Sequence, residues 1–525
     1  MLAVYLWRWW YMLAAVTEEI ETQITAPMSK VMLYKANRRR NQEAARQQLR
    51  RYYNDPVAWA ENCIAWPEGR SLLPYQRDVL AAIPVHGRVA QRGPRGLGKS
   101  TTSAIALLWF VTTREAAGVD WKCITTAGGW HQLEHFLWPE IHRWAKLIRW
   151  DRLGRKPFNM RTELLKLNLN LKYGSAFAVA STDPGRIEGA HADSIFYIYD
   201  ESKTITDATF DACEGAFSGA GVLGREAFAL ASSTPGDPSG RFYDIHSHKQ
   251  GYEDWWTKHV TLYDAIRARQ ITTKWAKQRK HQWGKNSQLY ANHALGEFHS
   301  TDEDSVIPLS WIEAAVMRWY ENASKPIDRL ERLGCDIGGS GDGDKTVFAP
   351  VHGGRIGELK YVHHEDTEQI ATRIKGIARA NPSVQVIIDA DGMGVGVFDK
   401  LNHTEGVDVK PFHAGVKTDK VDKSGELTFL NQRSAAWWQL RELLDPMEGS
   451  TIELPDDDLL VGDLSAPKWI DRQAKGVIQV ESKDDIKKRL GRSTDSGDAV
   501  MMALWRPRKR RKARMTFAGP AERVA

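Results

Sequence analysis

Two groups of residues in this chain have the types and the spacing to act on phosphates. The first is the run Gly93–Ser100, which reads GPRGLGKS and fits the pattern GxxxxGK[ST]. In such a loop the backbone N–H groups cradle phosphate oxygens, the lysine reaches the β- and γ-phosphates, and the hydroxyl binds Mg²⁺. The second group is three aspartates, Asp336, Asp389 and Asp498. Together they suggest nucleotide hydrolysis in one half of the chain and phosphodiester cleavage in the other.

The phosphate loop lies between a short predicted strand, residues 87–91, and a predicted helix over residues 101–110. A helix that begins directly after the loop adds the positive end of its dipole to the site. The residues predicted to bind the nucleotide here are Gly93, Pro94, Arg95, Gly96, Leu97, Gly98, Lys99, Ser100 and Thr101.

An acidic pair, Asp200 and Glu201, follows an apolar run at residues 194–199 that predicts a buried strand. About a hundred residues after a phosphate loop, such a pair is typical of the second half of a nucleotide-hydrolysing site. We expect Asp200 to hold Mg²⁺ through water and Glu201 to polarise the attacking water.

Three further features fit the same site, although each alone is more often structural. Gln76 lies just upstream of the loop, where a glutamine can read an adenine edge. The small-residue strand at 229–235 ends in hydroxyls, among them Thr234, that could sense the γ-phosphate. Arg95 could supply positive charge to the transition state.

The second half of the chain has the element order of an RNase H-like fold. Asp336 lies at the end of a predicted strand, and a second strand and a hairpin turn follow it. A helix over residues 367–380 precedes a strand that ends in Asp389, and Asp498 starts a late apolar helix. Two divalent ions roughly 4 Å apart, held by such carboxylates, can drive an in-line displacement at phosphorus. Hard carboxylate ligands suit Mg²⁺ or Mn²⁺.

The third acid has an alternative. We prefer Asp498 because it is expected to open the late helix, whereas Asp495 is expected to cap that helix or to assist. Asp344 and Asp391 are accessory candidates.

A chain of 525 residues is too long for one ordinary core, so an α/β protein of several domains is expected. Four widely spaced cysteines favour a reducing compartment over a zinc or disulfide framework. The predicted division is a basic helical arm at 1–55, a P-loop ATPase domain at 56–250, a helical linker at 251–325, an RNase H-like domain at 326–506 and a basic tail at 507–525.

Charge is concentrated at the C-terminal end. Residues 506–514 read RPRKRRKAR, and the net charge of +6 less these seven basic residues leaves about −1. Such a tail could contact a phosphate backbone or only keep the chain soluble. The apolar segment at residues 1–16 is broken by Arg8 and is too short to span a bilayer, so no membrane association is expected. It reads as an amphipathic docking helix or as the product of an upstream start site.

These residues together resemble the large terminase subunits of tailed double-stranded DNA bacteriophages over about residues 56–505. The family joins a packaging ATPase of the ASCE type to an RNase H-like nuclease. Its loop often has arginine four residues before the lysine, as Arg95 stands here, and its Asp-Glu pair matches Asp200-Glu201. Its coupling motif is similar to residues 232–234, and its nuclease acids map onto Asp336, Asp389 and Asp498. The departures are Pro94 and Gly96 in the loop, and Thr494 where the family usually has proline.

The resemblance implies ATP and Mg²⁺ as cofactors, with Mn²⁺ as an alternative at the nuclease site. It implies double-stranded DNA, a portal protein and a small terminase subunit as partners. It also implies a homo-oligomeric ring, a pentamer, on the procapsid, in the host cytoplasm and absent from the mature virion. A trans-acting arginine finger is expected, and the sequence leaves four candidates open: Arg143, Arg152, Arg161 and Arg186.

Two other function classes remain alternatives. A helicase-nuclease of repair or recombination would share the ATP site but should carry further helicase motifs after the coupling strand. A non-enzymatic DNA-binding or capsid-assembly protein would not need Lys99, Glu201 and three intact acids.

Overall fold

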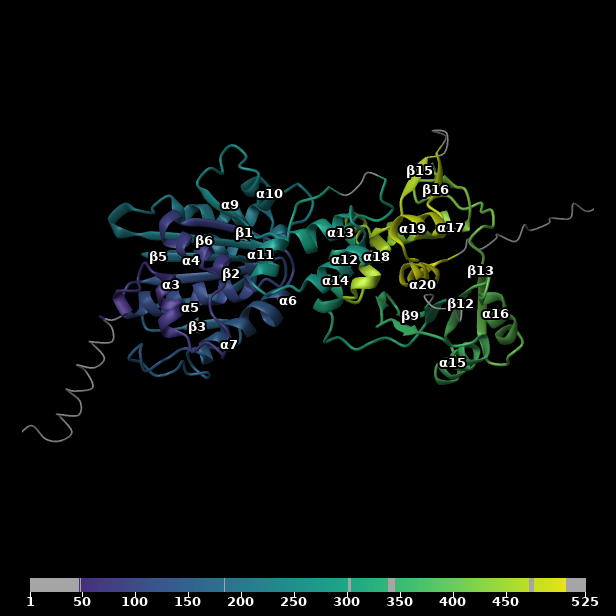
Figure 1. Cartoon of the computed structure of the whole chain (residues 1–525), viewed down its shortest axis with the longest axis horizontal. Coiled ribbons are helices and arrows are strands. Elements are labelled where there is room, and N and C mark those ends of the chain that lie inside the picture. The colour runs from purple at the N-terminus through teal and green to yellow at the C-terminus, as the bar shows by residue number, and fades with distance from the viewer. Residues whose placement is uncertain are drawn as a thin grey trace, which may run out of the picture.

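The computed structural model describes residues 47, 49–183, 185–300, 304–338, 345–471 and 476–506. Figure 1 shows two lobes joined through a group of helices: the N-terminal half forms one lobe and the C-terminal half the other. Most of the predicted basic arm, the whole tail at 507–525 and the accessory candidate Asp344 lie outside the described residues.

The first lobe is built on a seven-stranded sheet in the order β3-β4-β2-β5-β6-β1-β7. All neighbouring strands are parallel except β3, which runs antiparallel to β4. The strands are β1 (Arg88–Arg92), β2 (Trp121–Ala127), β3 (Asn168–Asn170), β4 (Gly174–Ala180), β5 (Ser194–Asp200), β6 (Glu226–Ser233) and β7 (Trp255–His259). Strand β6 separates β1, which leads into the phosphate loop, from β5, which ends in Asp200. This is the strand insertion of an ASCE-type P-loop NTPase.

Helices cover both faces of this sheet, which is why its central strands are buried along most of their length rather than at alternate residues. All seven residues of β5 are buried. The helical segments of the lobe are α3 (Pro56–Cys63), α4 (Pro74–His86), α5 (Lys99–Ala117), α6 (Trp130–Gln132), η1 (Leu133–Leu137), α7 (Trp138–Lys146), α8 (Gly185–Glu188), η2 (Ser202–Thr204), α9 (Asp207–Phe217), η3 (Val222–Gly224) and α10 (Arg241–His246).

The segment predicted as a helical linker begins with a strand instead. Strand β7 pairs with β1 in parallel, with Arg88 opposite Trp255 and Arg92 opposite His259. The helical prediction for these residues is therefore wrong. Trp255 and Trp256 lie on an edge strand, and aromatic side chains are common in strands. The helical segments that follow are α11 (Leu262–Arg267), α12 (Thr273–Trp283), α13 (Gln288–Tyr290), η4 (Ala291–Leu295) and α14 (Leu309–Glu321).

The second lobe is built on a sheet in the order β10-β9-β8-β12-β13, with β11 also paired to β9. The hairpin strands β9, β10 and β11 are antiparallel, whereas β12 and β13 run parallel to β8. The strands are β8 (Arg332–Asp336), β9 (Thr346–His352), β10 (Arg355–Ile356), β11 (Lys360–Val362), β12 (Gln385–Asp389) and β13 (Asp408–Phe412). This is the RNase H-like order that the sequence predicted.

Helices pack on both faces of the second sheet. One face carries α15 (Thr367–Ala380) and α16 (Gly394–Asn402), and α20 (Asp495–Leu504) lies against β8 and β9. The remaining elements are β14 (Thr428–Phe429), α17 (Gln432–Leu444), η5 (Pro446–Glu448), α18 (Asp458–Ser465), β15 (Trp469–Asp471), β16 (Val477–Val480) and α19 (Lys483–Leu490). Strands β14, β16 and β15 form a small third sheet.

The linker helices share a hydrophobic core with the second lobe. Trp283 and Ile312 belong to the same buried cluster as Trp437, Leu460 and Met501. Because this core is continuous, α12 and α14 are fixed to the nuclease-type lobe, and a movement of one is felt by the other.

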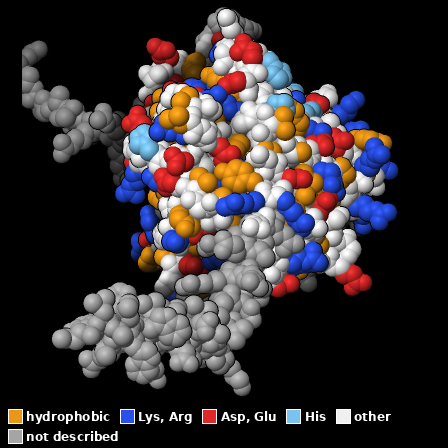
Figure 2. Space-filling model, turned by 90° about the vertical axis from the view of Figure 1, so that its left-hand side faces the viewer, with side chains coloured by type: hydrophobic (Ala, Val, Ile, Leu, Met, Phe, Trp, Pro, Cys, Tyr) orange, Lys and Arg blue, Asp and Glu red, His pale blue; other side chains and the backbone are white. Residues whose placement is uncertain are grey.

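Two surface observations complete the fold. Among the described residues no helix combines the length and the apolar character needed to cross a bilayer. The end of the first lobe seen in Figure 2 mixes basic, acidic and apolar side chains wherever grey atoms do not cover it. That face therefore gives no sign of a large single-charge surface for nucleic acid.

Candidate ATPase and nuclease sites

The phosphate loop connects the end of β1 to the first residue of α5, as predicted. Gly96 and Gly98 adopt φ values of 80° and 75°, which glycine reaches without strain. A Cβ on Gly93 would lie 2.7 Å from the carbonyl oxygen of Val260, so that position also requires glycine. The glycines at positions 93, 96 and 98 therefore determine the backbone path of the loop.

Lys99 folds back over this loop. Its Nζ donates to the carbonyl oxygens of Pro94, at 2.9 Å, and of Gly93, at 3.4 Å. Burial lowers the pKa of Lys99, while the nearby Glu201 and Asp200 act in the opposite sense. The ammonium thus lies at the loop's centre, beside both acids of the predicted pair.

Asp200 sits at the end of β5 with 2% of its surface exposed. The hydroxyl of Ser100 lies 3.4 Å from both carboxylate oxygens, and Gln132 Nε2 donates to one of them at 3.3 Å. Burial, with a further contribution from Glu201, raises the pKa of Asp200 to about 7. Ser100 and Asp200 therefore form the pair of oxygen ligands that a Mg²⁺ ion would need.

Glu201 has a strained backbone, with φ at 48° in the left-handed region that non-glycine residues rarely adopt. Its Oε2 accepts hydrogen bonds from Ser233 Oγ at 3.0 Å and Thr234 Oγ1 at 3.4 Å. The register of β5 against β6, with Asp200 opposite Ser232, creates these contacts. The structure thus brings Thr234 together with Glu201, and the role of Thr234 as a phosphate sensor stays a prediction.

Gln76 contacts the phosphate loop itself. Its Nε2 donates to the carbonyl oxygen of Gly98 at 3.3 Å, and its Oε1 accepts from the backbone N–H of Leu73. Thr101, the last residue of the predicted binding set, donates to Glu140 at 3.1 Å. The reading of an adenine edge by Gln76 stays a prediction.

Arg95 points away from the loop toward the second lobe. Its Nη1 lies 3.6 Å from Asp458 Oδ1 and 4.0 Å from Asp456 Oδ1, and 45% of its side chain is exposed. Its backbone N–H donates to the carbonyl oxygen of His293 in η4 at 3.0 Å. The linker thus touches the loop directly, which the sequence did not indicate.

A cavity of about 740 Å³ opens beside the loop, between the ATPase lobe and the linker. Its lining includes Arg95, Ser100 and Glu201 from the first lobe and Glu313 from α14. Lys203 bonds both oxygens of Glu313 at 2.9 Å, and His293 Nε2 bonds one of them at 3.0 Å. Lys203 and His293 hold the pKa of Glu313 low despite its burial, so the linker presents a charged carboxylate to the site.

The predicted nuclease acids come together at one edge of the second sheet. Cys335 pairs with Ile388, so the next residues, Asp336 and Asp389, end two adjacent parallel strands side by side. Gly334 allows α20 to lie on β8, because a Cβ there would stand 2.0 Å from the carbonyl oxygen of Ala499. This close approach brings the first turn of α20 to Asp336.

Asp495, not Asp498, is the first residue of α20, so the expectation that Asp498 opens this helix is wrong. Thr494 occupies the position before the helix, and Asp498 lies one turn in, 3% exposed. Asp498 accepts from Arg433 Nη1, from Trp437 Nε1 at 3.2 Å and from Thr494 Oγ1 at 3.0 Å. Either acid could still serve as the third ligand, because both face the same space.

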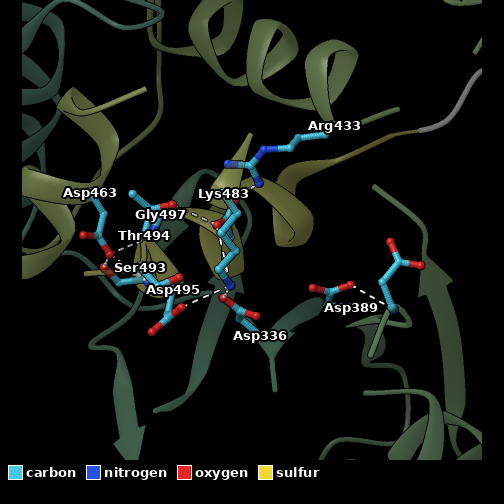
Figure 3. Close-up of polar contacts among 12 residues, drawn as sticks. Asp336, Asp389, Arg433, Asp463, Lys483, Ser493, Thr494, Asp495 and Gly497 are labelled. Atoms are coloured by element: carbon cyan, nitrogen blue, oxygen red, sulfur yellow. Dashed lines mark hydrogen bonds and ion pairs between the residues drawn. The ribbon is translucent and has the colours of Figure 1, made fainter. Parts of the chain in front are cut away.

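Lys483, the first residue of α19, lies among these acids (Figure 3). Its Nζ stands 2.7 Å from Asp336 Oδ2, 3.1 Å from Asp495 Oδ1 and 3.9 Å from Asp498 Oδ2. The carboxylates of Asp336 and Asp389 point into the space beside this ammonium. Lys483 therefore shows that a positive charge is favoured between the acids.

The pKa values in this cluster follow burial and these cations. Burial raises the pKa of Asp336, and Lys483 only partly offsets it. Burial also raises the pKa of Asp389. At Asp498 burial is outweighed by Arg433 and Lys483, so its pKa is lowered. The site is thus a group of buried carboxylates that depends on bound positive charge.

The ligand chemistry suits a hard divalent cation, since the converging groups are all carboxylates. In the part of the chain that the structure describes, however, no three Asp, Glu, His or Cys side chains are arranged to hold a metal ion. Instead, Lys483 forms an ion pair with Asp336, and Arg433 forms one with Asp498. A metal ion shared by Asp336 and Asp498 would compete with the Lys483 ammonium for this space.

Two residues that the sequence did not single out organise this site. Asp463 of α18, 2% exposed, accepts from the backbone N–H groups of Ser496 at 3.0 Å and Gly497 at 3.4 Å, and it pairs with Arg492. An acid inside the largely apolar run LLVGDL, residues 459–464, was a usable signal for it. Lys483 carried no such signal, because a lysine at the start of a charged helix is ordinary.

The accessory candidate Asp391 has a structural role. Its Oδ2 accepts from the backbone N–H of Ala414 at 2.8 Å, and its Oδ1 lies 3.1 Å from His413 Nδ1. Its own N–H donates to Asp389 Oδ1 at 3.1 Å, so Asp391 helps to orient the neighbouring acid.

No protein-family model matches the chain. The "Probable terminase, large subunit" of Enterobacteria phage P7 is 25% identical over 434 residues, which span 78% of this chain and 83% of that protein. Among solved structures, the large terminase of a thermophilic bacteriophage in complex with ATP-gamma-S is 13% identical, with a TM-score of 0.38, over 83% of this chain and 99% of that one. The nuclease domain of the large terminase subunit gp2 of bacterial virus Sf6 is 17% identical, with a TM-score of 0.33, over 39% of this chain and 100% of that one.

The fold and the two sites define a P-loop ATPase joined to an RNase H-like nuclease. The sequence relation to the phage P7 protein runs through both halves and does not favour a helicase-nuclease. This similarity, over 78% of this chain and 83% of the phage P7 protein, supports a large terminase subunit. Together with the two sites, it supports an ATPase and metal-dependent nuclease of viral DNA packaging.

Proposed function

We propose that this chain hydrolyses ATP at the loop Gly93–Ser100 to drive double-stranded DNA into a procapsid, and cuts concatemeric DNA at Asp336, Asp389 and Asp498. The observation that carries the residue assignment is the register of β8 against β12, which sets Asp336 beside Asp389. The same chain carries the phosphate loop Gly93–Ser100, in which Lys99 lies near Asp200 and Glu201.

In the ATPase lobe, Lys99 would exchange its loop carbonyls for the β- and γ-phosphates. Ser100 and Asp200 would hold Mg²⁺, which supplies charge neutralisation on the phosphates. Ser233 and Thr234 fix Glu201 Oε2, so that this carboxylate accepts a hydrogen bond from the attacking water and orients it. Because Ser233 ends β6 and Thr234 follows it directly, a change at Glu201 would be passed into the central sheet.

In the nuclease lobe, Asp336, Asp389 and Asp498 would hold divalent metal, Mg²⁺ or Mn²⁺. The metal would supply activation of water and stabilisation of the leaving oxygen. Arg433, Trp437 and Thr494 keep Asp498 in one orientation throughout. Lys483 would leave the acids as metal enters, and its ammonium would then be available to a DNA phosphate.

The family supports further partners for this chain. We propose a ring of five copies, bound to the portal protein of a procapsid in the host cytoplasm and absent from the mature virion. A small terminase subunit would select the DNA. Contacts with the phosphate backbone would be largely independent of sequence and would weaken as salt rises.

Plasmid cleavage tests the residue assignment. Purified wild type, Asp389→Ala and the control Asp408→Asn, an exposed acid on the adjacent strand β13, are compared with Mg²⁺ or Mn²⁺. Asp389→Ala should lose at least about a thousandfold in cleavage rate, since it removes a ligand of the reacting metal. ATP turnover should stay within about twofold of wild type. Equal cutting by wild type and Asp389→Ala would refute the assignment.

A further inference from the structure

Helix α18 lies between the phosphate loop and the nuclease acids. At its first residue, Asp458 Oδ1 stands 3.6 Å from Arg95 Nη1, and Asp458 Oδ2 stands 3.2 Å from Arg279 of α12. Asp456, two residues earlier, lies 4.0 Å from the same Arg95 nitrogen and accepts from Tyr320 Oη at 2.8 Å. One end of α18 is therefore held by a residue of the phosphate loop.

The same helix holds the nuclease acids through Asp463. This carboxylate takes up the first backbone N–H groups of α20, those of Ser496 and Gly497, together with the Ser496 hydroxyl. A Cβ on Gly497 would stand 3.1 Å from Asp463 Cβ and from the Trp437 ring, so Gly497 packs tightly against Asp463. Ser496 and Gly497 lie between Asp495 and Asp498, so the positions of both acids depend on Asp463.

Helix α18 is short and rigid enough to transmit a movement. Asp458 and Asp463 are five residues apart, which is about 7.5 Å along a helix axis. Asp457 caps the helix by accepting from Leu459 N at 2.8 Å and Leu460 N at 3.1 Å. Leu460 and Leu464 are fully buried in the core shared with the linker. A packed element of this kind shifts as a unit rather than bending.

We propose that α18 couples the two active sites, so that ATP binding slows DNA cutting. Arg95 belongs to the loop that takes the phosphates, and a bound triphosphate competes with Asp456 and Asp458 for its guanidinium. When Arg95 turns to the nucleotide, the Asp458 carboxylate keeps only its contact with Arg279. Helix α18 then shifts as a unit, and Asp463 moves relative to the first turn of α20. Cutting is then favoured when the ATP site is empty, and DNA that is being translocated is spared.

This inference rests on the proposed nuclease function and predicts a modest effect. Exposed ion pairs contribute about 0.2–1 kcal/mol each, so two such pairs correspond to a change of about twofold to thirtyfold in rate. The coupling therefore shows as a ratio of two cleavage rates, not as the presence or absence of cutting.

The experiment measures plasmid cleavage in Mg²⁺ with and without a non-hydrolysable ATP analogue. Wild type should be slowed about twofold to thirtyfold by the analogue. In the double variant Asp456→Asn/Asp458→Asn, the nucleotide-free rate should already be low, and the ratio should fall to about one. Asp458→Glu keeps the charge and should keep the ratio, as should the distant control Asp408→Asn. Thermal unfolding of each variant checks that it is folded.

Amide hydrogen exchange provides a readout that does not need cutting. In wild type the analogue should speed exchange in residues 458–465 and 495–500, and in the double variant exchange should be fast in both states. An unchanged wild-type ratio together with unchanged exchange, or a ratio that persists in the double variant, would overturn the coupling. Loss of cutting under every condition would count against the nuclease assignment alone, because exchange would still report on α18.

Discussion

The phosphate-loop site and the nuclease site are assembled in different ways. In the first, a continuous loop supplies its own geometry, and Lys99 is satisfied by carbonyls of Gly93 and Pro94. In the second, carboxylates from β8, β12 and α20 meet a lysine from α19 and an arginine from α17. The first site is built by backbone and the second by side chains that are distant in sequence.

This difference indicates which substitutions should reduce the activity of each site. A backbone-built site depends on a few reacting groups and on the glycines that shape it. A side-chain-built site depends also on residues such as Asp463 and Lys483 that hold or balance its acids. Substitutions outside the reacting groups should therefore matter more in the nuclease lobe than in the ATPase lobe.

Glu201→Gln should produce the largest of these effects and should separate the two sites. It removes the carboxylate that orients water, so ATP turnover should fall by about 10²–10⁴-fold. Nucleotide-free plasmid cleavage should remain within about twofold of wild type. Phosphate release and cleavage are measured on the same preparation. A parallel loss of both activities would mean that the sites are not separately assembled.

Asp463→Asn should reduce cleavage about 10- to 100-fold, the range typical of groups that orient metal ligands. The reason is that an amide nitrogen would face the N–H groups of Ser496 and Gly497, which now have a carboxylate acceptor. ATP turnover should be retained. The Asp408→Asn variant serves as the control, and unchanged cleavage by Asp463→Asn would show that α20 needs no such support.

Ser233→Ala should have a smaller effect in the ATPase lobe. It removes the 3.0 Å hydrogen bond to Glu201 but leaves Thr234 in place, so turnover should fall by about tenfold, as for one bond to a charged group. The loss should appear in kcat rather than in KM for ATP. A large rise in KM with normal kcat would point to phosphate binding by Ser233 instead.

Lys483→Met should produce the smallest shift, in the metal requirement of the nuclease. Without the ammonium beside Asp336, Asp495 and Asp498, divalent metal has no competing cation. The Mg²⁺ concentration for half-maximal cleavage should fall about fivefold, as expected for about 1 kcal/mol of competition. A requirement that stays the same or rises would show that Lys483 does not compete with metal.

Several features of the fold could be predicted from local patterns alone. The loop Gly93–Ser100, the strand ending in Asp200 and the hairpin after Asp336 are each contiguous, so spacing and hydrophobic runs were enough to place them. Strand β7 was missed because its two tryptophans fit a helix as well as an edge strand. The start of α20 was misplaced by three residues, because the cap at Thr494 gives a weak signal among several polar residues.

By itself the sequence determined both chemistries, because phosphate binding and metal-dependent cleavage need particular residue types at readable spacings. Only the tertiary structure decided which side chains hold those groups in place. Three contacts join segments that are far apart in the chain. Lys483 lies among the nuclease acids, Asp463 accepts hydrogen bonds from the first turn of α20, and Arg95 lies beside Asp458. Such contacts leave no local pattern, since they arise from the packing of whole elements around a shared core.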